Sequence, residues 1–109
     1  NSNSDTATAK FMVEILKMQG FELNTATCNT CNKGFEDKVY FDIGLNCFLC
    51  ENCNRFNCEQ IDIDIVKTIS TLQNNKFVEL ARMSFDEKTL KTTKKMLKEI
   101  INRQFFLNL

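Results

Sequence analysis

The chain has 109 residues, a formal net charge of zero, 43% hydrophobic residues and 26% charged residues. This length suits one domain rather than two, and the composition excludes a chain that is disordered overall. We find neither a signal peptide nor an apolar run long enough to span a bilayer in these residues, so no membrane association is expected.

The chain opens on a polar segment without apolar periodicity, so residues 1–10 are expected to be a frayed or vector-derived N-terminus. The first residue is not methionine, which favours a piece of a longer protein. A helical pattern follows from Ala7 to Gln19, and Gly20 is expected to end it. Its buried stripe is expected to contain Phe11, Ile15 and Met18, widened by Val13 and Leu16.

A short hairpin is predicted in the middle of the chain. Residues of β-type run from Lys38 to Asp42, and Gly44 breaks the run. Residues 46–49 are expected to pair back across that turn.

Three further helices are expected after the hairpin. The first is capped by Asp62 or Asp64 and runs to about Asn74, and the second covers residues 76–83. The last begins after Ser84 or Asp86, with a buried stripe of Leu90, Leu97, Ile100, Ile101 and Phe105. The predicted fold class is therefore mainly α, with residues 11–109 forming one small helical domain that carries an inserted hairpin.

Six cysteines and no histidine are the most informative feature of the composition. The cysteines all lie within residues 28–58 and come in C-x-x-C units, and no export signal is present. Structural disulfides are typical of exported domains, whereas two C-x-x-C units in one chain are a recurring zinc pattern. The sequence therefore predicts a structural Zn²⁺ rather than disulfides.

The spacing leaves two choices for the zinc ligands. Cys28 and Cys31 supply one pair, and the second pair is either Cys47 with Cys50 or Cys50 with Cys53. We favour Cys28, Cys31, Cys50 and Cys53, because residues 48 and 49 then form a strand that leads into the second turn. Cys47 and Cys58 are then expected to be packing residues.

An iron–sulfur cluster would accept the same thiolates, but nothing else in the sequence suggests electron transfer. A catalytic zinc site keeps an open position and usually has histidine or a carboxylate base beside it. An all-thiolate site is closed. We therefore expect a binding module, not an enzyme, with no small-molecule substrate.

The C-terminal segment is locally basic. From Lys88 onward the chain has six Lys or Arg residues and one acidic residue. At about 100° per residue, four of the lysines fall on one flank of the last helix. They are candidates for contact with phosphates or an acidic partner, although a solvated surface has the same pattern: Lys88, Lys91, Lys95 and Lys98.

The order of these features carries a family resemblance. A helix ends in Gly20-Phe21, Cys28-x-x-Cys31 follows, and Phe41 precedes a turn. Next come Leu49-Cys50-x-x-Cys53 and a last helix that starts after Phe85-Asp86-Glu87-Lys88. This order resembles the C-terminal region of the bacterial recombination mediator RecO. The resemblance also favours Cys50 and Cys53 as ligands.

The resemblance implies a cytoplasmic, nucleoid-associated role in DNA repair and homologous recombination. RecO-like proteins bind DNA, anneal strands coated by single-stranded DNA-binding protein, and act with RecR to load RecA. The implied partners are thus the acidic tail of single-stranded DNA-binding protein, RecR and DNA. The family's N-terminal oligonucleotide-binding barrel lies outside these 109 residues and is implied to make most of the DNA contact.

Two other classes of function compete with this interpretation. One is a zinc-ribbon scaffold in another nucleic-acid-processing assembly, such as transcription or translation machinery. The other is a redox enzyme using C-x-x-C, which is disfavoured because no βαβ pattern surrounds the cysteines.

Overall fold

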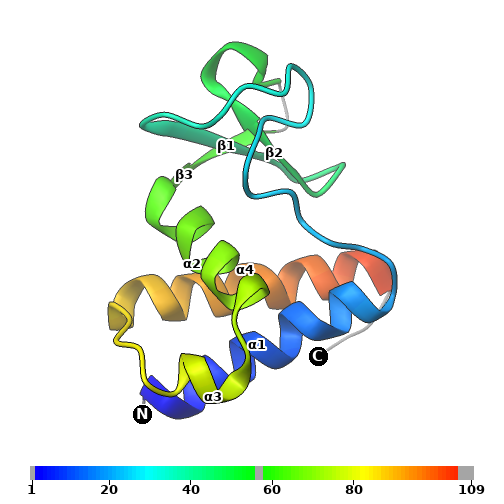
Figure 1. The fold of residues 1–109 in the computed structure, drawn as a ribbon. Helices are drawn as coiled ribbons and strands as arrows, with labels where there is room; N and C mark the ends of the chain where they lie inside the picture. The colour runs from blue at the N-terminus through cyan, green and yellow to red at the C-terminus, as the bar shows by residue number, and fades with distance from the viewer. Residues whose placement is uncertain (1, 56–57, 106–109) are drawn as a thin grey trace. The chain divides into compact units, whose positions relative to one another are not determined.

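The computed structural model describes residues 2–55 and 58–105. The described residues form four α-helices, α1 (Ser2–Met18), α2 (Ile63–Asn74), α3 (Phe77–Leu80) and α4 (Glu87–Phe105) (Figure 1). Three strands, β1 (Lys38–Asp42), β2 (Cys47–Cys50) and β3 (Cys58–Asp62), and the short 3-10 helix η1 (Glu51–Cys53) complete the fold. The predicted class, mainly helical with an inserted four-cysteine segment on strands, is confirmed.

The chain divides into two compact units. One is the segment Leu23–Lys67, which contains the sheet. The other combines Asn1–Glu22 with Thr68–Leu109 and is helical, so the sheet unit is inserted into it along the sequence.

The core of the helical unit is formed by aliphatic side chains from all four helices. α1 contacts both α4 and α3, and α1 and α4 run side by side in the same direction (Figure 1). The buried apolar side chains are those of Ala9, Val13, Leu16, Ile69, Leu72, Leu80, Leu90, Leu97, Ile100 and Ile101. Four of the five residues expected on the buried stripe of the last helix are among them, and the fifth, Phe105, is half-buried.

α1 begins at Ser2, five residues before the expected start. Residues 2–10 are therefore helical, although we expected residues 1–10 to be frayed; Asn1 lies outside the described residues. Contacts to α4 explain the difference. The Lys94 ammonium lies 2.8 Å from Asp5 Oδ1, and its hydrogen bond lowers the pKa of Asp5, while Thr6 is buried.

The expected stripe of α1 was wrong in part. Phe11 is 60% exposed and Met18 80% exposed, whereas Val13 and Leu16 are buried as expected, together with Ala9. α1 carries apolar residues on two sides, so periodicity alone does not decide which side enters the core. Small and medium side chains occupy the contact with α4, as close helix packing favours.

Lys10 is buried and connects α1 to the end of α2. Its ammonium donates to the carbonyl of Leu72 at 2.7 Å and lies 2.6 Å from Glu14 Oε1. The Leu72 carbonyl belongs to the last turn of α2, where carbonyls have no partner within the helix. The hydrogen bond from Lys10 lowers the pKa of Glu14.

Helix ends follow the residues that the sequence marks. Gly20, with φ of 77°, ends α1, and the Phe21 N–H donates to the Leu16 carbonyl at 2.8 Å. Asp62 accepts from the Asp64 N–H at 2.9 Å at the start of α2. Asp86 accepts from the Thr89 N–H at 3.0 Å at the start of α4, and this bond lowers the pKa of Asp86. The third helix is shorter than expected, Phe77–Leu80.

The sheet has the order β2–β1–β3, with both pairings antiparallel. β1 has the predicted bounds, and β2 is shifted by one residue toward the C-terminus, running from Cys47 to Cys50 instead of over residues 46–49. β3 was not predicted, because its sequence, CEQID, is largely polar. Its residues are exposed or half-buried, and the strand pairs with β1 along one of its edges.

We expect Lys10→Met to destabilise the protein by about 1–3 kcal/mol, because the Leu72 carbonyl and Glu14 would lose a charged donor. Lys17→Met on the same helix is the matched control: Lys17 is exposed, and its replacement should change stability by less than about 0.5 kcal/mol. Urea unfolding of both variants gives the comparison. Equal effects of the two substitutions would contradict the role given to Lys10.

Candidate metal centre

The β1–β2 hairpin places the second group of cysteines. Its register pairs Val39 with Cys50 and Asp42 with Cys47. The turn is closed by the Asn46 N–H, which donates to the Asp42 carbonyl at 2.7 Å. Asn46 adopts the left-handed backbone conformation, with φ of 52°.

An aromatic cluster supports this hairpin. The ring of Phe48 lies 5.4 Å from that of Phe41 and 6.4 Å from that of Phe35, between ring centroids. Edge-on and tilted aromatic pairs at these distances are favourable. The inner side of the hairpin is therefore fixed independently of any metal ligand.

The first C-x-x-C forms a tight turn attached to β2. The Cys28 N–H donates to the Lys33 carbonyl at 2.8 Å, and the Asn32 N–H donates to the Cys28 carbonyl at 3.0 Å. Asn32 has φ of 65°, which lets the chain reverse. The Asn29 N–H donates to the Phe48 carbonyl at 3.0 Å, so the turn is held beside the end of the hairpin.

The second ligand pair depends on the 3-10 turn that follows β2. β2 ends at Cys50, and η1 runs from Glu51 to Cys53. In a 3-10 turn, side chains three residues apart lie on the same side. Cys50 and Cys53 therefore lie on the same side of this turn. The first turn brings Cys28 and Cys31 together in a similar way.

The four thiols converge. The Sγ atoms of Cys28, Cys31, Cys50 and Cys53 all lie within 4.8 Å of one another. The Cys31 and Cys50 sulfurs are 3.7 Å apart. A tetrahedron with Zn–S bonds of about 2.3 Å has edges of about 3.8 Å. The donor set and its spacing thus fit a tetrahedral Zn²⁺ site with no position left for water.

Cys47 and Cys58 lie outside this group. Cys47 and Cys50 are three residues apart on β2, so their side chains leave opposite faces of the strand. Cys47 and Cys58 both pair with Asp42, one from each side of β1. Burial raises the pKa of the Cys47 thiol, and Cys58 Sγ accepts from the Arg55 N–H at 3.2 Å.

Two of the four thiols, those of Cys28 and Cys53, have pKa values shifted in opposite directions. Burial alone would raise the pKa of Cys28, but hydrogen bonds from the backbone of Cys31, Cys50 and Thr30 outweigh it and lower that pKa to about 6. The hydrogen bond between Cys53 and Cys50, with burial, raises the pKa of Cys53 to about 12. Zinc takes thiolates, so metal binding would release the remaining thiol protons.

An ion pair connects Arg55, two residues after η1, to the end of β1. Arg55 Nη2 lies 3.0 Å from Asp42 Oδ2, and the side chain of Asp42 is buried. The other oxygen of Asp42 accepts from the Leu45 N–H at 3.0 Å. The buried Asp42 carboxylate therefore binds both the hairpin turn, through Leu45, and the side chain of Arg55.

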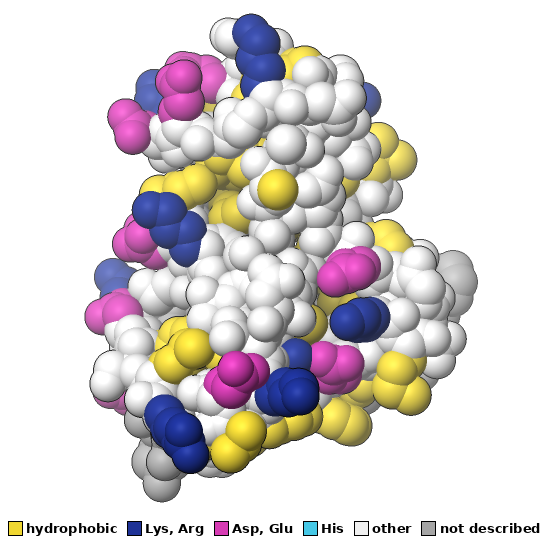
Figure 2. Space-filling view, viewed as in Figure 1, with side chains coloured by type: hydrophobic (Ala, Val, Ile, Leu, Met, Phe, Trp, Pro, Cys, Tyr) yellow, Lys and Arg dark blue, Asp and Glu magenta, His cyan; other side chains and the backbone are white. Residues whose placement is uncertain are grey.

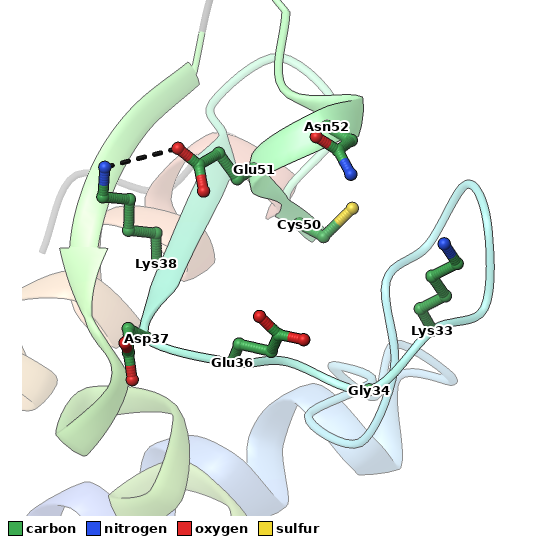
Figure 3. A pocket seen from close by; sticks show the side chains of 8 residues that line it. All are labelled: Lys33, Gly34, Glu36, Asp37, Lys38, Cys50, Glu51 and Asn52. Carbon is green, nitrogen blue, oxygen red and sulfur yellow. Dashed lines mark hydrogen bonds and ion pairs between the residues drawn. The ribbon is translucent and has the colours of Figure 1, made fainter.

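A cavity of about 210 Å³ adjoins the thiol cluster, with Cys50 in its wall. Figure 3 shows the Cys50 sulfur and the side chains of Glu36 and Asn52 around the opening, with Lys33 on the facing loop. Lys38 Nζ lies 3.3 Å from Glu51 Oε1 at the rim. The lining has three carboxylates and two ammonium groups, so its surface is polar and mixed in charge.

The basic candidates lie along α4. Lys88, Lys91, Lys95 and Lys98 are all exposed. Lys91 forms an exposed pair with Glu87 at 3.1 Å. Lys94, which the helical projection puts nearer the apolar side, is half-buried and pairs with Asp5. The four lysines therefore lie on the surface of the helical unit.

A mainly helical fold with an inserted cluster of four thiols defines a helical module that carries a possible zinc site. None of the helices in the described part of the chain is long and apolar enough to cross a membrane. The chain belongs to the family described as "Recombination protein O C terminal", which matches residues 1–109. The family resemblance is thereby confirmed, and with it a role in DNA recombination and repair. No curated protein and no solved structure matches the chain.

We expect one Zn²⁺ per chain, and we expect Cys28→Ser to lower metal content and thermal stability together, because metal binding and folding of such a site are coupled. Cys58→Ser is the matched control and should change neither. Elemental analysis and thermal unfolding measure the two quantities. A well-folded protein without zinc would contradict the assignment.

Proposed function

We propose that this chain is the zinc-stabilised interaction part of a RecO-like recombination mediator. The observation that carries the proposal is the family match over all 109 residues. In this proposal the chain is the C-terminal part of a longer protein, which acts in the cytoplasm on nucleoid DNA. It binds its partners without catalysing a reaction.

Zinc has a structural role in this proposal. Held by Cys28, Cys31, Cys50 and Cys53, the ion would cross-link the two turns of the sheet unit. The donor set supports this, because four thiolates leave no open coordination position. The sheet unit has a small apolar core, and small units gain most from such a cross-link.

The proposed partners are DNA, RecR and the acidic tail of single-stranded DNA-binding protein. With RecR, the whole protein would anneal strands coated by single-stranded DNA-binding protein and help RecA to load. The exposed lysines of α4 support the contact with acidic or phosphate groups.

We expect the 109-residue chain to bind the acidic C-terminal peptide of single-stranded DNA-binding protein with roughly micromolar affinity. Affinity should fall as salt is added, because exposed charges are screened within about 10 Å at 0.1 M salt. Fluorescence anisotropy with a labelled peptide gives both quantities. Absence of binding at low salt would remove this partner from the chain.

We expect replacement of Lys91, Lys95 and Lys98 by Gln to weaken DNA binding by the full-length protein if these lysines contact phosphates. The slope of log affinity against log salt should shrink by roughly one unit per lost contact. Thermal stability should barely change, because exposed lysines contribute little to it. An unchanged slope would make the four-lysine flank a solvated surface, and DNA contact would belong to another part of the protein.

A further inference from the structure

The strand β3 forms one edge of the sheet (Figure 1). In the part of the chain that the structure describes, its ladder partner is β1, which lies along its inner side. Glu59, Gln60 and Asp62 of this strand are exposed, and Cys58 and Ile61 are half-buried. An edge strand presents backbone N–H and C=O groups that an extended segment of another chain can pair with.

The register indicates which backbone groups of β3 point outward. In an antiparallel pair of strands, hydrogen-bonded residue pairs alternate with pairs that are not hydrogen-bonded. The Cys58 N–H donates to the Arg55 carbonyl at 3.1 Å, which lies outside β1, so Cys58 and Asp42 form a pair of the second kind. Gln60 is two residues further along and has the same phase. Its N–H and C=O therefore point away from β1, and Gln60 is the centre of the outer edge.

This edge is acidic. β3 contains two carboxylates, Glu59 and Asp62, and its sequence has no basic residue. Neither carboxylate forms an ion pair with a residue that the structure describes. Both are exposed, so they are available to cations of a segment that pairs with β3.

The whole sheet unit has the same sign of charge. The segment Leu23–Lys67 contains seven acidic and four basic residues, although the chain as a whole is neutral. Acidic side chains gather along one margin of this unit, at the upper left of Figure 2. Four thiolates around one Zn²⁺ would add two further negative charges. A segment that docks on this unit is therefore expected to be cationic.

The register of an antiparallel fourth strand specifies the pattern of that segment. The residues opposite Asp62 and Glu59 would each face a carboxylate, and they are three positions apart. The residue opposite Ile61 would lie on the sheet face that carries the buried Val39, which favours an apolar side chain there. From its N-terminus to its C-terminus, the segment therefore reads basic, apolar, any residue, basic.

Two other occupants fit this edge less well. A second copy of the chain, paired through its own β3, would bring four carboxylates to one seam with no cation in either strand. Nucleic acid binds through its phosphates, which the carboxylates of Glu59 and Asp62 repel. The charges that oppose these two occupants attract a cationic strand.

We propose that the outer edge of β3 docks an extended, basic segment of a partner protein as a fourth antiparallel strand. The N–H and C=O of Gln60 bind the backbone of the segment, and Glu59 and Asp62 receive its two cationic side chains. The site uses other residues than the lysines of α4, and its partner has the opposite charge from the acidic and phosphate groups proposed for those lysines.

The probe is a labelled peptide, acetyl-Thr-Lys-Val-Thr-Lys-Thr-amide, titrated against the zinc-loaded 109-residue chain at about 0.1 M salt, where distant charges are screened. Glu59→Lys combined with Asp62→Asn should weaken binding about tenfold, because the peptide's lysines lose their carboxylates. Asparagine retains the acceptor that Asp62 offers to the Asp64 N–H at the start of α2.

The matched control is Glu36→Lys combined with Glu51→Gln. It makes the same change in net charge, on exposed residues of the sheet unit that line the cavity beside Cys50. It should change the affinity for the peptide less than about twofold, because neither residue belongs to β3.

Three further measurements separate strand pairing from simple attraction of charges. Hydrogen exchange at the Gln60 amide should slow on binding, because this N–H gains an acceptor. N-methylation of the peptide residue opposite Gln60 should weaken binding about tenfold, because it removes the donor to the Gln60 carbonyl. A peptide with Glu in place of its second Lys should bind Glu59→Lys more tightly than it binds the parent chain.

Several results would overturn the inference. They are no binding of the peptide at about 1 mM protein, equal binding of a peptide with Val and the first Lys exchanged, and unchanged exchange at Gln60 in the complex. Loss of binding in the Glu36 and Glu51 control alone would assign the peptide to the cavity. Slowing of Gln60 exchange with protein concentration, in the absence of peptide, would assign the edge to a second copy of the chain.

Discussion

The sheet unit is organised around one geometric feature: four sulfur atoms from two separate turns lie within 4.8 Å of one another. Cys31 and Cys50 are 19 residues apart in sequence, yet their sulfurs are 3.7 Å apart. The β1–β2 hairpin brings these sulfurs together, because β2 ends at Cys50 beside the turn that contains Cys28 and Cys31. The Asn29–Phe48 backbone hydrogen bond and the Phe41–Phe48 ring contact hold the two turns together.

The same geometry selects among six cysteines. A strand alternates its side chains, so Cys47 and Cys50 leave opposite faces of β2, whereas the 3-10 turn returns Cys53 to the side of Cys50. The two thiols of a C-x-x-C unit therefore lie on the same side only where the backbone between them turns. Along β2 the same spacing separates them.

Local signals in the sequence predicted much of the fold. Gly20, Asp62 and Asp86 mark helix ends through interactions within a few residues, and β1 has a clear β-type composition. β3 could not be predicted in this way, because its polar residues form a strand only by pairing with β1. The start of α1 also depends on a distant residue, Lys94, which pairs with Asp5.

The buried side of α1 was the other failure. Periodicity predicted a buried stripe of Phe11, Ile15 and Met18, widened by Val13 and Leu16, but only Val13 and Leu16 are fully buried, together with Ala9. Lys10 is also buried in the core, where its ammonium donates a hydrogen bond to the Leu72 carbonyl. The sequence alone does not predict this burial of a lysine. For the metal centre, the sequence predicted which cysteines meet, while the hydrogen bonds that hold the turns came only from the structure.

The pairing of Asp5 with Lys94 joins residues 89 positions apart and has a consequence for folding kinetics. α1 and α4 cannot meet until the chain between them closes a long loop, and the entropy lost on closure grows with the length of flexible chain. The inserted sheet unit lies within that loop. Once it is compact, the flexible part of the loop is shorter, so assembly of the helical unit is faster after the insert has folded. A metal that stabilises the insert would in this way also act on the rate at which the two ends of the chain find each other.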